Sequence, residues 1–180
     1  MTTQGGAPRW EIRKDQTAPA SHYVLAQVSN DSAGACSPLA ILNTVTLRDG
    51  DLSVRIKPVA GREERTGGLV WRYRDENNYY LARANALRKD VEIYKVEKGR
   101  LLPIARNGAR RLETGVKHEI PSNAWSILKV SIRGDTFQVY FDHRLVLQAQ
   151  DSTFSGPGKV GLWTKADSVT YFDEFRVSPR

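Results

Sequence analysis

The sequence predicts an all-β domain made of two antiparallel sheets packed face to face. Nearly every segment alternates apolar and polar residues, the breaks are clusters of Gly, Pro, Asn and Asp, and helix signals are nearly absent. About a dozen extended segments without crossover helices can bury their apolar faces as two antiparallel layers. We expect one domain over residues 1–180, with residues 1–9 flexible.

The expected strands follow one another along almost the whole chain. In the segment 137–142, Phe137, Val139 and Phe141 share one face and Gln138 lies on the other, as a sheet with one buried side requires. The predicted strands are residues 24–28, 39–47, 52–58, 69–74, 78–85, 91–96, 100–105, 125–133, 137–141, 145–150, 159–164 and 169–177.

Polar turns predict how neighbouring strands connect. The turns at residues 48–51, 97–99 and 133–135 each place a glycine where a tight reversal needs a positive φ angle. We therefore expect each of them to join its flanking strands as an antiparallel hairpin. The run Asp-Glu-Asn-Asn at residues 75–78 predicts a further hairpin, because these residue types bond their own backbone in turns.

Composition and charge limit the classes of function. The net charge is +7, but acidic residues are interleaved with the basic ones, so nucleic acid is not the expected partner. No apolar run approaches the roughly 20 residues that cross a bilayer. The single cysteine, Cys36, excludes an internal disulfide, and the three histidines lack the spacing of a transition-metal site. The sequence does not assign a cellular compartment, and a periplasmic or secreted location is favoured if a signal peptide has been removed.

Most of the chain, roughly Trp10 to Val177, resembles a known family. The hairpin at residues 67–85, followed by the segments 125–130, 137–142, 158–168 and 172–175, resembles laminin G-like, concanavalin A-like jelly rolls. It looks most like the bacterial group called 3-keto-disaccharide hydrolase or domain of unknown function. The resemblance implies a jelly-roll sandwich with one concave face, on which relatives commonly bind or process carbohydrate. Fold resemblance does not by itself carry an activity.

The candidate ligand-binding residues combine basic side chains with aromatic rings. A sugar needs an apolar platform for its C–H face and donors for its hydroxyl or acid groups, and tryptophan with arginine supplies both. Alternation puts Arg72 and Arg74 on one face of their strand, and Trp163 and Lys165 on one face of theirs. The alternative is that Trp163 is a core residue and the arginines are solvated. The candidates are Arg72, Arg74, Tyr80, Arg83, Trp163 and Lys165.

Three classes of function remain open. The leading one is a β-sandwich that binds carbohydrate or another polar ligand without catalysis. The family label implies a second, a hydrolase or lyase acting on oxidised (3-keto) sugars, with Asp142 or Asp167 as base and Lys165 or an arginine stabilising an oxyanion. The chain lacks the Glu-x-Asp-x-x-Glu strand of the concanavalin-like glucanases, which argues against ordinary retaining glycosidase chemistry. The third class is a protein-interaction module with a basic face.

Calcium is the one cofactor that the resemblance implies. Some relatives hold a structural calcium between an N-terminal loop and an aspartate of a C-terminal strand. The resemblance assigns that role to Asp173, whose carboxylate is a hard oxygen ligand. Only one carboxylate of such a site can be identified from the sequence.

Overall fold

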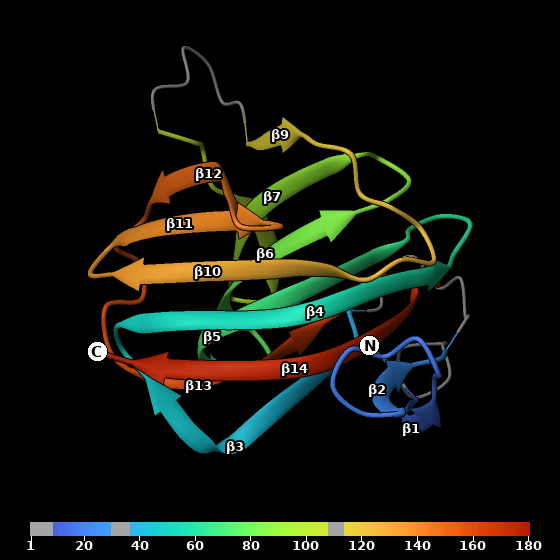
Figure 1. Cartoon of the computed structure of the whole chain (residues 1–180). Helices are drawn as coiled ribbons and strands as arrows, with labels where there is room; N and C mark the ends of the chain where they lie inside the picture. Colours follow the sequence, from blue (N-terminus) through green and yellow to red (C-terminus); the bar gives the residue numbers. More distant parts are fainter. Residues whose placement is uncertain (1–8, 30–36, 108–113) are drawn as a thin grey trace.

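The chain forms a sandwich of two antiparallel sheets (Figure 1). The computed structural model describes residues 9–29, 37–107 and 114–180, so Cys36 and nearly all of the expected flexible segment 1–9 lie outside the described residues. The described strands are β1 (Trp10–Lys14), β2 (Tyr23–Gln27), β3 (Leu39–Leu47), β4 (Gly50–Ala60), β5 (Thr66–Asp75), β6 (Asn78–Asn85), β7 (Asp90–Glu97), β8 (Arg100–Pro103), β9 (Gly115–Lys117), β10 (Ser126–Arg133), β11 (Thr136–Phe141), β12 (Arg144–Gln150), β13 (Gly158–Trp163) and β14 (Val169–Pro179).

The two sheets interleave strands from distant parts of the chain. Sheet A has the order β1-β2-β14-β4-β10-β11-β12, and sheet B has the order β3-β13-β5-β6-β7-β8, with β9 also pairing with β7. The predicted all-β sandwich and its twelve strands are confirmed, and β1 and β9 are additional. None of the described residues forms a helix that is long and apolar enough to cross a membrane.

Three of the four predicted hairpins are confirmed, and one is wrong. Strands β5 and β6, β7 and β8, and β10 and β11 pair as expected. The turn at residues 48–51 instead joins β3 of sheet B to β4 of sheet A. Gly50 lies at this corner with φ of 150°, and a Cβ atom there would lie 2.4 Å from the carbonyl oxygen of Ser178. The corner therefore needs glycine because the chain changes layers against another strand.

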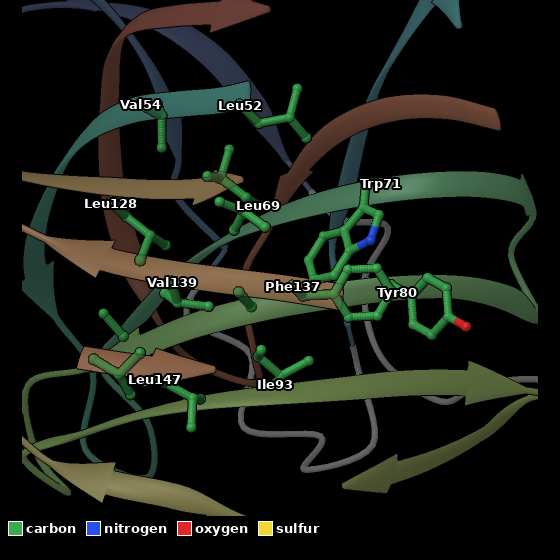
Figure 2. Close-up of a cluster of buried hydrophobic side chains, with 14 of the residues drawn as sticks. Leu52, Val54, Leu69, Trp71, Tyr80, Ile93, Leu128, Phe137, Val139 and Leu147 are labelled. Carbon is green, nitrogen blue, oxygen red and sulfur yellow. The ribbon is translucent and has the colours of Figure 1, made fainter. Parts of the chain in front are cut away.

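The core between the sheets is held together by an aromatic cluster (Figure 2). Trp71 stacks on Tyr80 with ring centroids 5.6 Å apart, and Phe137 of the opposite sheet contacts both rings at 5.1 and 4.8 Å. Burying one such side chain stabilises the fold by about 1.5–3 kcal/mol. The rows expected to be buried on β10 and β11 are at most 1% exposed: Leu128, Val130, Ile132, Phe137, Val139 and Phe141.

A bulge in β5 changes which side chains face the core. Arg72 has φ of 49°, and the pairing of β5 with β6 shifts register between Trp71 and Asp75. Arg72 consequently points inward like Trp71, and Tyr73 packs on the other side of sheet B. A Cβ atom on Gly158 would lie 2.5 Å from the Arg72 carbonyl carbon, so the bulge also depends on this glycine.

Candidate functional site on sheet B

The face of sheet B that points away from sheet A, here called the outer face of sheet B, carries a second apolar cluster. On β6, Tyr80 and Ala82 point into the core, whereas Tyr79 and Leu81 point to the outer face. The partly buried Tyr73 and Tyr94 pack against these outer side chains. The buried members of the cluster are Val70, Tyr79, Leu81, Val96 and Trp163.

Strand register places an indole ring and a guanidinium group in one row on this face. Trp163 lies opposite Gly68, Gly68 opposite Arg83, and Arg83 opposite Glu92. A Cβ atom on Gly68 would lie 3.4 Å from the Trp163 ring, so the indole lies closely over the glycine. Two strand spacings of about 4.8 Å therefore separate the strand of Trp163 from that of Arg83.

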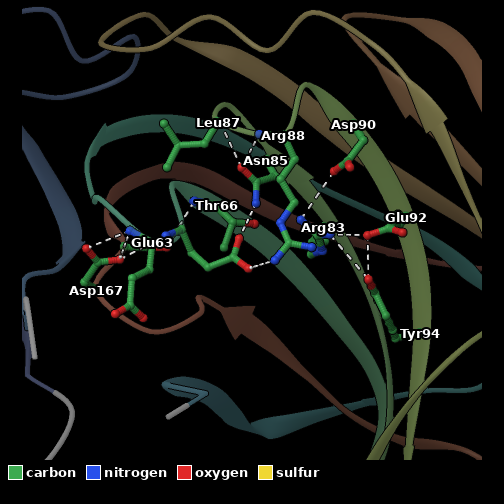
Figure 3. A network of polar contacts seen from close by, with 12 residues as sticks. Glu63, Thr66, Arg83, Asn85, Leu87, Arg88, Asp90, Glu92, Tyr94 and Asp167 are labelled. Atoms are coloured by element: carbon green, nitrogen blue, oxygen red, sulfur yellow. Dashed lines mark hydrogen bonds and ion pairs between the residues drawn. The ribbon is translucent and has the colours of Figure 1, made fainter. Parts of the chain in front are cut away.

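Arg83 is the centre of a buried ionic cluster on the outer face (Figure 3). It is 4% exposed, and its guanidinium forms ion pairs with Glu92 and, at 3.4 Å, with Asp90. It also donates a hydrogen bond of 3.3 Å to the Tyr94 hydroxyl. We call these four residues the Arg83 cluster. Burial alone would lower the pKa of Arg83, but Tyr94 and the two carboxylates outweigh burial and raise it, so the group stays a cation.

Three polar atoms of this face are buried without a hydrogen bond in the described part of the chain. Arg83 Nη1 and Asp90 Oδ1 form an ion pair with each other at 3.4 Å, and the third atom is the indole nitrogen of Trp163. Burial also raises the pKa of Asp90, which Arg83 lowers only in part. Buried polar atoms are nearly always hydrogen-bonded in folded proteins. The contact between Arg83 and Asp90 is therefore an ion pair whose geometry falls short of a hydrogen bond.

Asp167 holds the loop beside the Arg83 cluster. Its carboxylate accepts hydrogen bonds from the backbone N–H groups of Arg62, Glu63 and Glu64. Burial opposes ionisation, but these hydrogen bonds outweigh it and lower the pKa of Asp167. A carboxylate with a lowered pKa is a poor general base. The structure thus gives Asp167, a predicted catalytic residue, a role in positioning the loop.

The loop held by Asp167 brings a further carboxylate to the polar face. Glu64 accepts hydrogen bonds from Asn85 and, at 2.6 Å, from Arg88. The Arg88 side chain is 54% exposed, so the network extends from the buried cluster to solvent. Lys117, 82% exposed, reaches the second oxygen of Asp90 at 3.8 Å. These two cations form the solvent-exposed edge of the network.

An open pocket of about 740 Å³ adjoins the outer apolar cluster. Two tyrosines, Tyr73 and Tyr79, line it with ring centroids 5.7 Å apart. We call it the Tyr73 pocket. Among the predicted ligand-binding residues, Arg74 lines it, exposed to solvent. The other lining residues are Ser37, Leu39, Ile41, Asn43, Asp75, Glu76 and Lys159.

The structure does not bring the other predicted ligand-binding residues into one open trough. The β5 bulge puts Arg72 on the side of Trp71, where the opposite side was expected, and Arg72 donates to the carbonyl oxygens of Phe154, Arg48 and Gly134. Tyr80 lies in the core and donates a 2.7 Å hydrogen bond to Asp151.

Trp163 and Lys165 were expected to share one face of their strand, with burial of Trp163 as the alternative. Trp163 is on the outer face of sheet B but only 1% exposed, so it supplies no open platform. Lys165 follows the end of β13 and is partly exposed. Its ammonium group makes no hydrogen bond or ion pair within the described residues.

Two further candidates lie away from the outer face of sheet B. Asp142 is in the turn between β11 and β12 and accepts a 2.7 Å hydrogen bond from the backbone N–H of Ile127. Asp173 accepts hydrogen bonds from the backbone N–H groups of Ala20 and Glu174 at 3.0 and 2.8 Å, which ties the N-terminal segment to β14. Over the described ranges no group of three His, Cys, Asp or Glu residues could hold a metal ion, so no ligand set accompanies Asp173.

The sequence interpretation missed the partners of Arg83. Asp90, Glu92 and Tyr94 alternate with Val91 and Ile93 along β7, which was predicted as a strand. The alternation is a usable signal, because the short turn between β6 and β7 fixes which residues face Arg83. No comparable pattern indicates that Tyr73 lies on the outer face, because the bulge before it cannot be located by counting alternate residues.

Comparisons with known proteins agree with this architecture. No family model matches the chain. Levanase from Bacillus subtilis (strain 168) is 33% identical over 132 residues, which is 73% of this chain but 16% of the levanase. The solved carbohydrate-binding module CBM66 from Bacillus subtilis has a TM-score of 0.74 at 26% identity, covering 94% of this chain and 92% of that one. A Bacillus subtilis protein of unknown function with a galectin-like fold has a TM-score of 0.60 at 12% identity, covering 95% and 90%. The chain is a concanavalin A-like jelly-roll sandwich.

Proposed function

We propose that this chain is a carbohydrate-binding module and that the outer face of sheet B holds its ligand. The observation that carries the proposal is the Arg83 cluster, a network of one guanidinium, two carboxylates and a tyrosine hydroxyl on the outer face of sheet B. The similarity to a carbohydrate-binding module and to part of a levanase supports the same class of ligand.

The chemistry of this face suits sugar hydroxyls. The carboxylates of Asp90 and Glu92 accept hydrogen bonds from hydroxyl groups, and the Arg83 guanidinium donates to hydroxyl or ring oxygens. Tyr73 and Tyr79 line the neighbouring Tyr73 pocket with aromatic surface for the C–H face of a sugar. In this proposal the ionic cluster orients one sugar unit and the pocket takes an adjoining part of the chain.

The test is binding of levan, with other neutral polysaccharides as comparison, measured by affinity electrophoresis and calorimetry. We expect binding that falls at least about tenfold in Glu92→Gln, because a charged hydrogen-bond acceptor is lost. Glu119→Gln is the matched control, because Glu119 is 78% exposed and its ion pair among the described residues is with Lys89. Thermal melting of each variant monitors folding.

Two results would contradict the proposal. If no polysaccharide of the set binds the wild-type chain, the carbohydrate-binding function is wrong. If Glu92→Gln and Glu119→Gln both bind as tightly as wild type, the function stands but the Arg83 cluster is not the site. Tyr94→Phe is a milder second variant, since it removes only the hydroxyl that contacts Arg83 and Glu92.

A further inference from the structure

A second groove lies on the opposite side of the sandwich, on the face of sheet A that points away from sheet B. Its volume is about 500 Å³, and its walls come from strands β14, β4, β10 and β11, which lie side by side (Figure 1). One row of paired residues crosses it: Arg176 lies opposite Ser53, Ser53 opposite Lys129, and Lys129 opposite Tyr140. The small Ser53 side chain leaves the middle of the row hollow between two cations.

Most of the charged side chains that line this groove are cationic. Arg55, Lys129 and Arg176 line it with a single carboxylate, Glu174. Their side chains are 35%, 38% and 69% exposed. Glu174 pairs with both arginines, and Lys129 pairs with Asp51 at 3.0 Å, but each arginine offers five donors and uses one on Glu174. Most of the guanidinium donors are therefore available to an anionic ligand.

A strained backbone fixes the two arginines around Glu174. Strand β14 has a bulge between Asp173 and Arg176, and Glu174 within it has φ of 48°. The bulge directs Glu174 toward Arg55 and Arg176, whose hydrogen bonds lower its pKa. Positive φ at a residue other than glycine is uncommon and often marks a functional site. The arrangement holds two guanidinium groups close together without neutralising both.

The rest of the groove suits a sugar ring. Tyr140 and Ile127 supply apolar surface, and the Lys129 ammonium lies 5.5 Å from the centroid of the Tyr140 ring. The Tyr140 hydroxyl donates to Gln138 at 3.1 Å, and Gln138 donates to Gln148 at 3.0 Å. This row of hydroxyl and amide groups continues the polar surface across β11 and β12. Such groups bond sugar hydroxyls, and the arginines match planar acid groups.

We propose that this groove is a second binding site, for a polysaccharide that carries acid groups. Arg55 and Arg176 bind a carboxylate or sulfate of the ligand, Lys129 adds charge, and Tyr140 packs against the sugar ring. The site is separate from the Arg83 cluster, because the two lie on opposite sides of the sandwich. The inference therefore does not depend on the ligand of sheet B.

The test is binding of the full chain to polygalacturonate, heparin and dextran in affinity electrophoresis at low and high salt. We expect retention by at least one of the two acidic polymers and none by dextran through this site. Retention falls at least about tenfold in the double variant R55Q/R176Q, and it weakens with salt because the arginines are exposed. The two acidic polymers distinguish carboxylate from sulfate as the preferred group. K129Q is a second variant that leaves the Glu174 pairs intact.

The controls separate this groove from sheet B and from general charge attraction. K89Q removes one exposed cation from the turn between β6 and β7 of sheet B, where the Lys89 side chain is 60% exposed, and is expected to retain acidic polymers normally. Equal retention of wild type and of both groove variants, with their folding confirmed by melting, would overturn the proposal. Tighter binding of single-stranded DNA than of either acidic polysaccharide would overturn the assignment to a sugar polymer.

Discussion

Arg72 and Arg83 lie on the neighbouring strands β5 and β6 and are both almost fully buried, yet their surroundings differ in kind. Arg72 lies between the sheets, where its guanidinium meets the carbonyl oxygens of Phe154, Arg48 and Gly134 and reaches a carboxylate, Asp49, only at 3.5 Å. Arg83 lies on the outer face of sheet B.

The pKa values reflect that difference. Burial lowers the pKa of Arg72, and Asp49 offsets burial only in part. The pKa of Arg83 is raised because Tyr94, Glu92 and Asp90 outweigh burial. Arg72 therefore ties loops to the sandwich with neutral acceptors, whereas Arg83 belongs to an ionised network in which two carboxylates depend on it. We infer a structural role for the first and a ligand-binding role for the second.

Replacing Arg83 should have the largest effect. Arg83→Met leaves Asp90 and Glu92 buried without their cation, and breaking a buried pair in this way costs about 3–5 kcal/mol in the free energy of unfolding. Carbohydrate binding should also be lost. Urea denaturation and calorimetry measure the two effects.

The loss of stability in Arg83→Met should depend on pH. Asp90 already has a raised pKa in the folded protein, and removing Arg83 raises it further. The folded state then binds more protons than the unfolded state between the ordinary pKa of aspartate and the raised value, so stability falls as pH rises through that window. The variant should approach wild-type stability in acid. A loss of equal size at every pH would contradict the ionic account.

Arg72→Met should have the next largest effect. It should lower the stability of the protein without changing its binding of carbohydrate. The variant leaves buried carbonyl oxygens without donors, which costs about 3 kcal/mol in the free energy of unfolding. Binding of carbohydrate by the folded protein should stay within about twofold of wild type, far less than the tenfold that 1.4 kcal/mol represents. Loss of binding in a folded Arg72→Met variant would show that the two arginines are not distinct in role.

The same two arginines show how far the sequence alone could lead. Alternation and turn residues were sufficient for the sandwich, for twelve strands and for the buried rows on β10 and β11. They were insufficient for Arg72, because one residue at φ of 49° reverses the facing of all that follows. The sequence did not fix the hairpin register that decides which face Arg83 lies on, and its role in binding stays a prediction.

The turn at residues 48–51 failed for a related reason. Its composition suits a hairpin, but local turn chemistry does not determine which sheet the next strand joins. That choice depends on Gly50 meeting Ser178 of β14, a contact across most of the chain. The buried state of Trp163 was likewise left open, because strand periodicity gives the face of a side chain and not its exposure.

Asp167→Asn should have the smallest effect on stability. It tests how the loop beside the Arg83 cluster is held in place. Asparagine keeps one acceptor oxygen for the N–H groups of Arg62, Glu63 and Glu64 but lacks the charge, so we expect a loss of about 1–2 kcal/mol in the free energy of unfolding. The pKa of Asp167 is lowered in the folded protein, so its contribution is present above the ordinary pKa of aspartate and disappears as pH falls through the lowered value.

The difference in the free energy of unfolding between Asp167→Asn and wild type should therefore shrink in acid. The difference between Arg83→Met and wild type should also shrink in acid, but for the opposite reason. In Asp167→Asn the wild type loses stability on acidification, whereas in Arg83→Met the variant gains it. Denaturation of all three proteins across the same pH range distinguishes the two cases. A difference between Asp167→Asn and wild type that persists unchanged in acid would mean that the shape of the Asp167 side chain, and not its charge, holds the loop that presents Glu64 to the polar face.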